Sequence, residues 1–275
     1  MTAFRKGRAL GGVAICVLLA LGGCKSVSMD DVTGSIGTPT APRSNSPEDL
    51  RAYSEKLAKV YEKHPEDKAT ALAYAKSLRM RELFDQAAAV LQNAAIKHSR
   101  DHEVLAAYGK SLADAGRLQE ASSALEQADT PDNPNWTVVS TRGTIADQLG
   151  DHERARSLYE VALKLAPGEP SVLSNLGLSY ALSRDLAQAE KLLREAAASP
   201  RADKRERQNL ALVLALQGKF AEAEQVSARD LTPQQAKENV AAIRQMISQS
   251  NAWRDIQTPA ARRKTERLSL DTTER

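Results

Sequence analysis

Few side chains in this sequence stand where they could carry out catalysis. The four histidines are scattered along the chain, and none belongs to an H-E-x-x-H motif. The sequence also has no G-x-S-x-G nucleophile motif, no phosphate-binding loop and no pair of carboxylates spaced for general acid–base catalysis. These observations predict a protein that is not an enzyme, acts on no small-molecule substrate and uses neither a cofactor nor a metal.

One cysteine stands where chemical modification of its thiol is expected. A basic segment at residues 5–8 precedes an apolar run at residues 9–21. This run is long enough for the core of a signal peptide and too short to span a bilayer. It ends in Leu21-Gly22-Gly23-Cys24, which resembles the bacterial lipobox.

The lipobox resemblance implies that residues 1–23 are a lipoprotein signal peptide and that the Cys24 thiol forms a thioether to diacylglycerol. Two or three acyl chains anchor a protein stably where one does not. Lys25, rather than an aspartate, follows the cysteine, which favours the periplasmic face of the outer membrane. The alternative is an ordinary secretory signal with an incidental cysteine.

Three pairs of side chains suited to binding lie 34 residues apart: Asn175 and Asn209, Leu178 and Leu212, Lys76 and Lys110. Asparagine amides both donate and accept hydrogen bonds, and leucines provide apolar surface. Arg205 lies four residues before Asn209, so that the two share one face of a helix. The fixed step must come from the elements that hold these side chains.

The small residues follow the same step of 34 residues. Five of them form one series, Ala75, Gly109, Gly143, Gly177 and Ala211. Twelve residues after each comes an alanine: Ala87, Ala121, Ala155, Ala189 and Ala223. Helix axes approach to about 8–10 Å only where the contacting side chains are small. The pattern therefore predicts closely packed helix pairs, and it resembles the tetratricopeptide repeat.

This resemblance implies an all-α fold, a right-handed α-solenoid of about five helix hairpins with N- and C-terminal capping helices. In peptide-binding members of the family, asparagine at the position of Asn175 and Asn209 hydrogen-bonds the backbone of an extended ligand. The implied peptide groove comprises Asn175, Asn209, Arg205, Leu178, Leu212, Lys76 and Lys110. The alternative is that these residues only form a solvated concave face.

Composition and helix signals divide the chain into segments. We expect a flexible tether at 24–45, a cap helix at 46–66, the repeats at 68–230, a capping segment at 231–256 and a disordered tail at 257–275. In the capping segment, Trp253 is expected to fold back on the preceding helix. Glu82 and Arg184 replace the glycine that ends the first helix in other repeats, so these two turns are expected to differ.

The net charge gives no reason to expect a nucleic-acid partner. The formal charge of +3 includes three basic side chains of the signal peptide, without which basic and acidic side chains balance.

The segment from Arg207 to Met246 is similar to the end of TadD-family lipoproteins, in which a turn like Asp230-Leu231-Thr232-Pro233 leads to a helix containing an asparagine, here Asn239. These proteins belong to the tight-adherence (Flp, type IVc pilus) assembly machinery. The resemblance implies a protein that assists assembly of a pilus or secretion apparatus through protein partners, the secretin among them. The alternative is a general periplasmic adaptor that scaffolds envelope enzymes or outer-membrane protein assembly.

Overall fold

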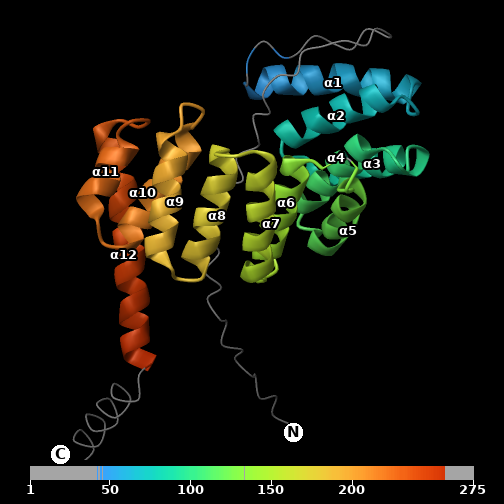
Figure 1. The fold of residues 1–275 in the computed structure, drawn as a ribbon. Coiled ribbons are helices and arrows are strands. Elements are labelled where there is room, and N and C mark those ends of the chain that lie inside the picture. The colour runs from blue at the N-terminus through green and yellow to red at the C-terminus, as the bar shows by residue number, and fades with distance from the viewer. Residues whose placement is uncertain (1–41, 43, 45, 133, 258–275) are drawn as a thin grey trace, which may run out of the picture.

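The computed structural model describes residues 42, 44, 46–132 and 134–257. The predicted signal peptide, Cys24, nearly all of the predicted tether and the predicted tail from residue 258 lie outside these residues. Within the described part the chain forms twelve α-helices and no strand, which confirms the all-α class (Figure 1). None of these helices is long and apolar enough to cross a membrane. The helices are α1 (Pro47–Lys63), α2 (Lys68–Met80), α3 (Phe84–Lys97), α4 (His102–Asp114), α5 (Leu118–Ala128), α6 (Trp136–Gln148), α7 (His152–Leu165), α8 (Pro170–Leu182), α9 (Leu186–Ala198), α10 (Lys204–Leu216), α11 (Phe220–Ser227) and α12 (Pro233–Gln257).

The helices repeat with the period of the sequence. The first helices of the five hairpins begin 34 residues apart, at Lys68, His102, Trp136, Pro170 and Lys204. The second helices keep the same step and begin at Phe84, Leu118, His152, Leu186 and Phe220. The expected solenoid of about five helix hairpins is therefore confirmed, with α1 before it and α12 after it.

Capping side chains fix where the first helices start. The Asp67 carboxylate accepts a hydrogen bond from the Thr70 amide at 2.7 Å, and Asp101 accepts one from the Val104 amide at 3.1 Å. Asp203 forms a reciprocal capping box with Glu206 at the start of α10. Each cap satisfies backbone N–H groups that have no partner within the helix.

The turns inside the five hairpins share one conformation. The second residue after each first helix has a positive φ: 59° at Glu82, 75° at Gly116, 86° at Gly150, 66° at Arg184 and 81° at Gly218. The next amide then bonds the carbonyl five residues back, as from Leu83 to Leu78 and from Asp185 to Tyr180, both at 3.0 Å. The Glu82 and Arg184 turns differ from the glycine turns only slightly, by a smaller positive φ, and the same hydrogen bond closes them.

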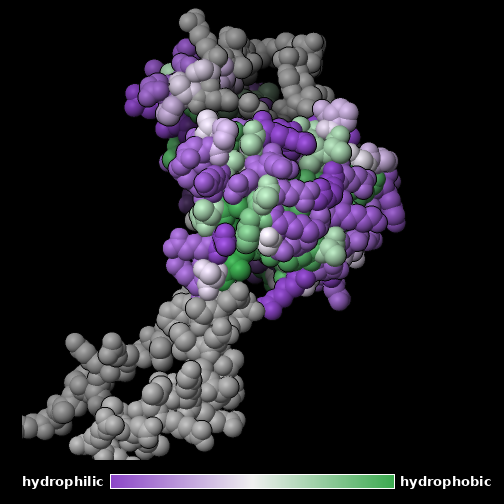
Figure 2. Space-filling view, turned by 90° about the vertical axis from the view of Figure 1, so that its left-hand side faces the viewer, coloured by the Kyte–Doolittle hydropathy of each residue, from purple (hydrophilic) through white to green (hydrophobic). Residues whose placement is uncertain are grey.

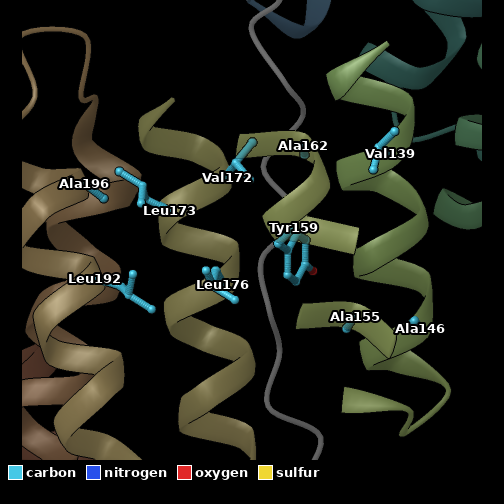
Figure 3. Close-up of a cluster of buried hydrophobic side chains, with 10 residues drawn as sticks. All are labelled: Val139, Ala146, Ala155, Tyr159, Ala162, Val172, Leu173, Leu176, Leu192 and Ala196. Carbon is cyan, nitrogen blue, oxygen red and sulfur yellow. The ribbon is translucent and has the colours of Figure 1, made fainter. Parts of the chain in front are cut away.

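Small residues lie where the two helices of a hairpin cross. A Cβ atom added to Gly143 would lie 2.6 Å from Tyr159 Cε1, and one added to Gly109 would lie 2.5 Å from Leu125 Cγ. No solvent reaches the second-helix alanines, which are Ala87, Ala121, Ala155, Ala189 and Ala223. Figure 3 shows Tyr159 in the middle of the apolar cluster that α6 to α9 share. Larger residues at these crossings would force the helices apart.

The hairpins stack in two layers. Each first helix packs closely against the first helix of the next hairpin, whereas the backbones of the second helices in the described chain stay farther apart and are joined only by long side chains, as in the Arg194–Glu222 ion pair. The more closely spaced layer lies on the inside of a curved stack, so α2, α4, α6, α8 and α10 are called the inner helices. Because α12 packs on both α10 and α11, it occupies the place of a sixth inner helix.

A helix closes each end of the stack. Ser54 and Leu57 of α1 are buried, and the Arg81 guanidinium donates a hydrogen bond to the Ser54 hydroxyl at 3.2 Å. At the other end, Ala236 and Val240 of α12 are buried. The expected fold-back at Trp253 is wrong, because α12 continues without a break to Gln257.

Candidate partner-binding face of the inner helices

The predicted groove residues lie on four of the inner helices. The structure brings one set together, because Asn175 and Leu178 of α8 occupy the same register as Asn209 and Leu212 of the adjacent α10. Lys76 of α2 and Lys110 of α4 lie at the opposite end of the stack. The predicted residues therefore form two separate parts of the inner face: a basic part over α2 and α4 and an amide–leucine part over α8 and α10.

Both asparagine amides are held by serines of the preceding inner helix. Asn209 Nδ2 donates to Ser174 Oγ at 2.9 Å, and Asn175 Nδ2 donates to Ser140 Oγ at 3.4 Å. Both serines are buried. These bonds orient each amide, so sequence reasoning that considered only the asparagines missed half of each pair. The signal was present, since Ser140 and Ser174 are also 34 residues apart.

Leucine side chains lie beside the two amides. Leu178 and Leu212 are half-buried, as is Leu216 near the end of α10. Leu182 at the end of α8 is 44% exposed, a large fraction for an apolar side chain. Partly exposed leucines that lie next to polar hydrogen-bonding groups favour contact with a partner. At the C-terminal end of the stack, Figure 2 shows further apolar surface surrounded by polar residues.

A half-buried carboxylate joins three helices behind this face. Asp147 of α6 accepts hydrogen bonds from Ser179 Oγ of α8 at 2.7 Å and from the Tyr159 hydroxyl of α7 at 3.1 Å. Its Oδ1 atom also lies 2.9 Å from His152 Nδ1. Burial, and then the charge of Asp147, raise the pKa of the Tyr159 hydroxyl, which therefore stays protonated and donates. The cluster fixes α6, α7 and α8 relative to one another.

The basic part of the inner face combines exposed charge with ion pairs. Lys76 is exposed, while Arg79 Nε donates to the Asp114 carboxylate at 2.6 Å and so joins α2 to α4. At the far end, Arg205 pairs with Asp203, at 3.3 Å, at the start of α10. In the described residues no three histidine, cysteine or acidic side chains gather in a way that could hold a metal ion.

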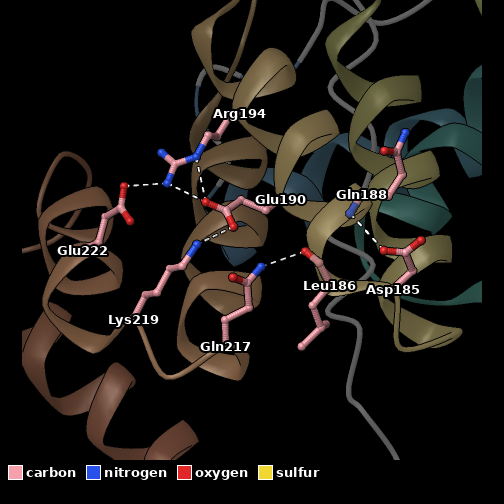
Figure 4. Close-up of polar contacts among 8 residues, drawn as sticks. All are labelled: Asp185, Leu186, Gln188, Glu190, Arg194, Gln217, Lys219 and Glu222. Carbon is pink, nitrogen blue, oxygen red and sulfur yellow. Dashed lines mark hydrogen bonds and ion pairs between the residues drawn. The ribbon is translucent and has the colours of Figure 1, made fainter.

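Polar contacts on the outer side tie the last hairpins together (Figure 4). Glu190 of α9 accepts from Lys219 Nζ at 2.6 Å and from the Arg194 guanidinium at 2.7 Å. Arg194 also reaches Glu222 of α11 at 2.6 Å. The α8–α10 face is therefore built on hairpins that are cross-linked from behind.

Family models of the tetratricopeptide repeat match the chain over residues 72–135 and 140–205, and over residues 209–229. No curated protein matches the sequence.

Several solved structures have a similar fold. PilF from Pseudomonas aeruginosa has a TM-score of 0.52 and 21% identity, over 66% of this chain and 81% of that one. A tetratricopeptide repeat protein from Parabacteroides merdae has a TM-score of 0.56 and 15% identity, over 74% of this chain and 87% of that one. The Cut9–Hcn1 structure of the APC/C has a TM-score of 0.60 and 16% identity, over 76% of this chain and 40% of that one. Identities this low show a shared fold alone.

Proposed function

We propose, from the premise that the chain belongs to the tetratricopeptide repeat family, that it is a scaffold which binds an extended segment of a protein partner over α8 and α10. Tetratricopeptide repeats form scaffolds for protein–protein interaction, and the fold is generally non-catalytic. The proposal therefore concerns which surface binds, where the protein is held and what it helps to assemble.

The register of Asn175 and Asn209 carries the proposal for the binding surface. Each amide uses an Nδ2 hydrogen for its serine, which leaves a carbonyl oxygen and a second N–H for a ligand. An extended peptide offers backbone donors and acceptors at regular intervals along its length. Leu178 and Leu212 lie beside the amides and supply apolar contact for the side chains of such a peptide.

Photo-crosslinking in the source cells tests this surface. A photo-reactive amino acid at Leu212 should capture one defined protein partner, whereas the same group at Val161, exposed on the outer helix α7, should not. Replacing Asn175 and Asn209 by alanine should lower the affinity of the captured partner roughly tenfold, because two hydrogen bonds of about 0.5–1.5 kcal/mol each are lost.

Asn93→Ala, at an exposed position on the outer helix α3, is the control for this double variant. Loss of the bonds to Ser140 and Ser174 also costs stability, so affinities are compared well below the melting temperature. Equal affinity in wild type and the double variant would place the ligand on another surface.

We also propose that the protein is a lipoprotein held at the periplasmic face of the outer membrane through Cys24. The supporting features are Leu21-Gly22-Gly23-Cys24 after an apolar run of signal-peptide length, and Lys25 after the cysteine. Cys24→Ser should release the protein from the membrane fraction without changing its melting temperature. If this variant still sediments with outer membranes, lipidation is not the anchor.

The assembly role we propose is in a Flp/Tad-type pilus or secretion apparatus, with the secretin as a partner. The similarity of the Arg207–Met246 segment to TadD-family lipoproteins supports it. In the structure this segment is held together by Arg207, whose guanidinium donates two hydrogen bonds to Asp230, at 2.6 and 2.7 Å.

Deletion of the gene in the source organism tests this role. The deletion should abolish surface pili and lower the amount of assembled secretin, and the intact gene should restore both. Normal pili, together with defects in envelope enzymes or in outer-membrane protein assembly, would favour a general periplasmic adaptor instead.

A further inference from the structure

We propose that the solenoid bends at the junction between α5 and α6, so that α1–α5 and α6–α12 move as two units. Figure 1 shows α1, α2 and α3 lying across the view while α6 to α11 stand upright. The proposal rests on the helix lengths, side chains and hydrogen bonds at this junction, compared with the same positions in the other repeats.

The first observation is a short outer helix. α5 has 11 residues, whereas α3 and α7 have 14 each and α9 has 13; the last outer helix, α11, is shorter still with 8. Pro131 stands at the repeat position of Lys97 and Leu165, which are the last residues of α3 and α7. Proline has no N–H and disfavours helical conformation in the residue before it, so α5 ends early. Less of α5 is left to pack against α6, and the packing there is sparser than at the three other junctions between successive hairpins, although the junction of α11 with the end helix α12 is similar.

The second observation is that a charged side chain of α6 stands at a repeat position where the other four repeats have leucine or tyrosine. Arg142 of α6 occupies the repeat position of Tyr74, Tyr108, Leu176 and Leu210. Leu176 and Leu210 are buried in the core clusters of their own repeats. Arg142 instead pairs with Asp129, and lies 3.9 Å from Glu126 of α5. An apolar contact between hairpins is thus replaced by ion pairs.

The ion pairs leave the junction incompletely packed. Arg142 Nε is buried and has no hydrogen-bond partner among the described residues. A cavity of about 140 Å³ lies beside it, with Ser122, Leu149 and Leu158 among the lining residues. An Nε donor without a protein partner, and a cavity where apolar side chains would otherwise pack, both weaken the junction. Val138 and Ile145 still pack on the core that α5 contributes to, so the two units stay attached.

The third observation concerns hydrogen bonds between inner helices. Three kinds of side-chain hydrogen bond join neighbouring inner helices elsewhere in the stack: Asn209 to Ser174, Ser179 to Asp147 and Arg79 to Asp114.

The same repeat positions on α4 and α6 hold other residues. The equivalent pairs there are Thr141 with Ala106, Ile145 with Ala113, and Gln148 with Ala113. Each pair includes an alanine, which has no polar side-chain atom. None of the three bonds can therefore form at this junction, and the Thr141 hydroxyl bonds the Thr137 carbonyl of its own helix at 2.7 Å.

A bend here would move the two parts of the inner face relative to each other. Lys76 and Lys110 lie on the first unit, and Asn175 and Asn209 on the second. A ligand that touches both parts would select one angle, and a ligand that touches only α8 and α10 would leave the angle free.

Spin-label distances between matched positions test the bend. Asn93, Gln127, Val161 and Glu195 are exposed on the four successive outer helices, α3, α5, α7 and α9, and are 34 residues apart. Each neighbouring pair is replaced by labelled cysteines in the full chain, with Cys16 and Cys24 changed to serine. The distance distribution of the 127–161 pair should be at least about twice as broad as those of the 93–127 and 161–195 pairs. Three distributions of equal width would overturn the proposal.

Arg142→Leu tests the cause, because it installs the residue type of the next two repeats. It should narrow the 127–161 distribution to the width of the two control pairs and leave the control pairs unchanged. A thermal melt confirms that the variant is folded. If the folded variant kept the wild-type width of the 127–161 distance distribution, Arg142 would not be a cause of the bend.

Discussion

Two exposed side chains, Glu82 and Arg184, hold a left-handed backbone conformation that three other repeats give to glycine. A side chain with a Cβ atom is disfavoured there by roughly 1–2 kcal/mol. The amide-to-carbonyl bonds that close each turn stabilise the hairpin enough to hold both residues in place.

Replacing Glu82 or Arg184 by glycine should therefore raise the free energy of unfolding by about 1 kcal/mol, since the strain disappears and no contact is lost. Gly116→Ala should lower it by a similar amount, because alanine acquires the strain. Chemical denaturation of the three variants measures both signs. A loss of stability in Glu82→Gly would show that the glutamate makes a compensating contact.

The candidate site shows what single residues reveal before a structure is known. The register of Asn175 and Asn209 follows from the step of 34 residues and was predictable. The same step shows that Ser140 and Ser174 are equivalent positions, but not that they bond these amides, because the bonded residues are 35 positions apart on neighbouring inner helices. Only the stacking angle of the hairpins determines which side chains meet across that boundary.

Between helices, charged side chains connect elements that apolar contacts leave separate. Hydrogen bonds from Lys219, and then from Arg194, lower the pKa of the Glu190 carboxyl to about 2, although partial burial opposes the shift. The folded-state pKa thus lies below the ordinary value of 4.5. The stabilisation is complete above about pH 4.5 and is lost as the pH falls towards 2.

Glu190→Gln should therefore lower stability at pH 6 and have little effect near pH 2. The difference should be at most about 1 kcal/mol, since solvent screens the exposed Lys219 and Arg194. Urea denaturation of wild type and variant at both pH values measures it. Glu195→Gln, at an exposed position on the same helix, is the control and should keep the pH dependence of wild type. An equal loss at both pH values would mean that the glutamate acts through packing.

Helix ends were less predictable than helix positions. The early end of α5 follows from Pro131, but its effect on the α5–α6 packing appears only when the lengths of equivalent helices are compared.

The continuation of α12 past Trp253 was not predictable from the sequence. Its apolar residues indicate a helix without indicating where it ends: Val240, Ile243, Met246 and Ile247. In the structure Met246 is 47% exposed, so the apolar face extends beyond the hairpins that bury its first part.

Across the whole molecule, each hairpin contacts only its neighbours, so damage should stay local. Val240→Ala removes buried apolar volume from the last core cluster and should cost about 2 kcal/mol of local stability. Hydrogen exchange should speed up in α10, α11 and α12 and stay unchanged in α2 to α5. Uniformly faster exchange along the chain would show instead that the whole array unfolds as one cooperative unit.

The overall fold was the most predictable feature because its cause is repeated. Small residues at each helix crossing require close packing, and five in-phase copies leave one arrangement that buries all of them. The weak junction was not predictable from any single repeat. It results from Arg142 in one repeat and from Ala106 and Ala113 in another, none of which is unusual by itself.

The constant step between helix starts makes the array modular. Excision of residues 170–203 removes one whole hairpin and leaves α10 to follow α7 without a change of phase. Asn209 would then face Ser140, which is a serine like the one that it bonds in the intact chain. Gain or loss of a hairpin in evolution would therefore preserve the phase of the helices and the amide–serine bonds of the inner face, whereas this excision would remove the bond from Ser179 to Asp147, because Val213 takes the place of Ser179. The number of amide sites along the groove would change by whole units, and with it the length of ligand that the protein holds.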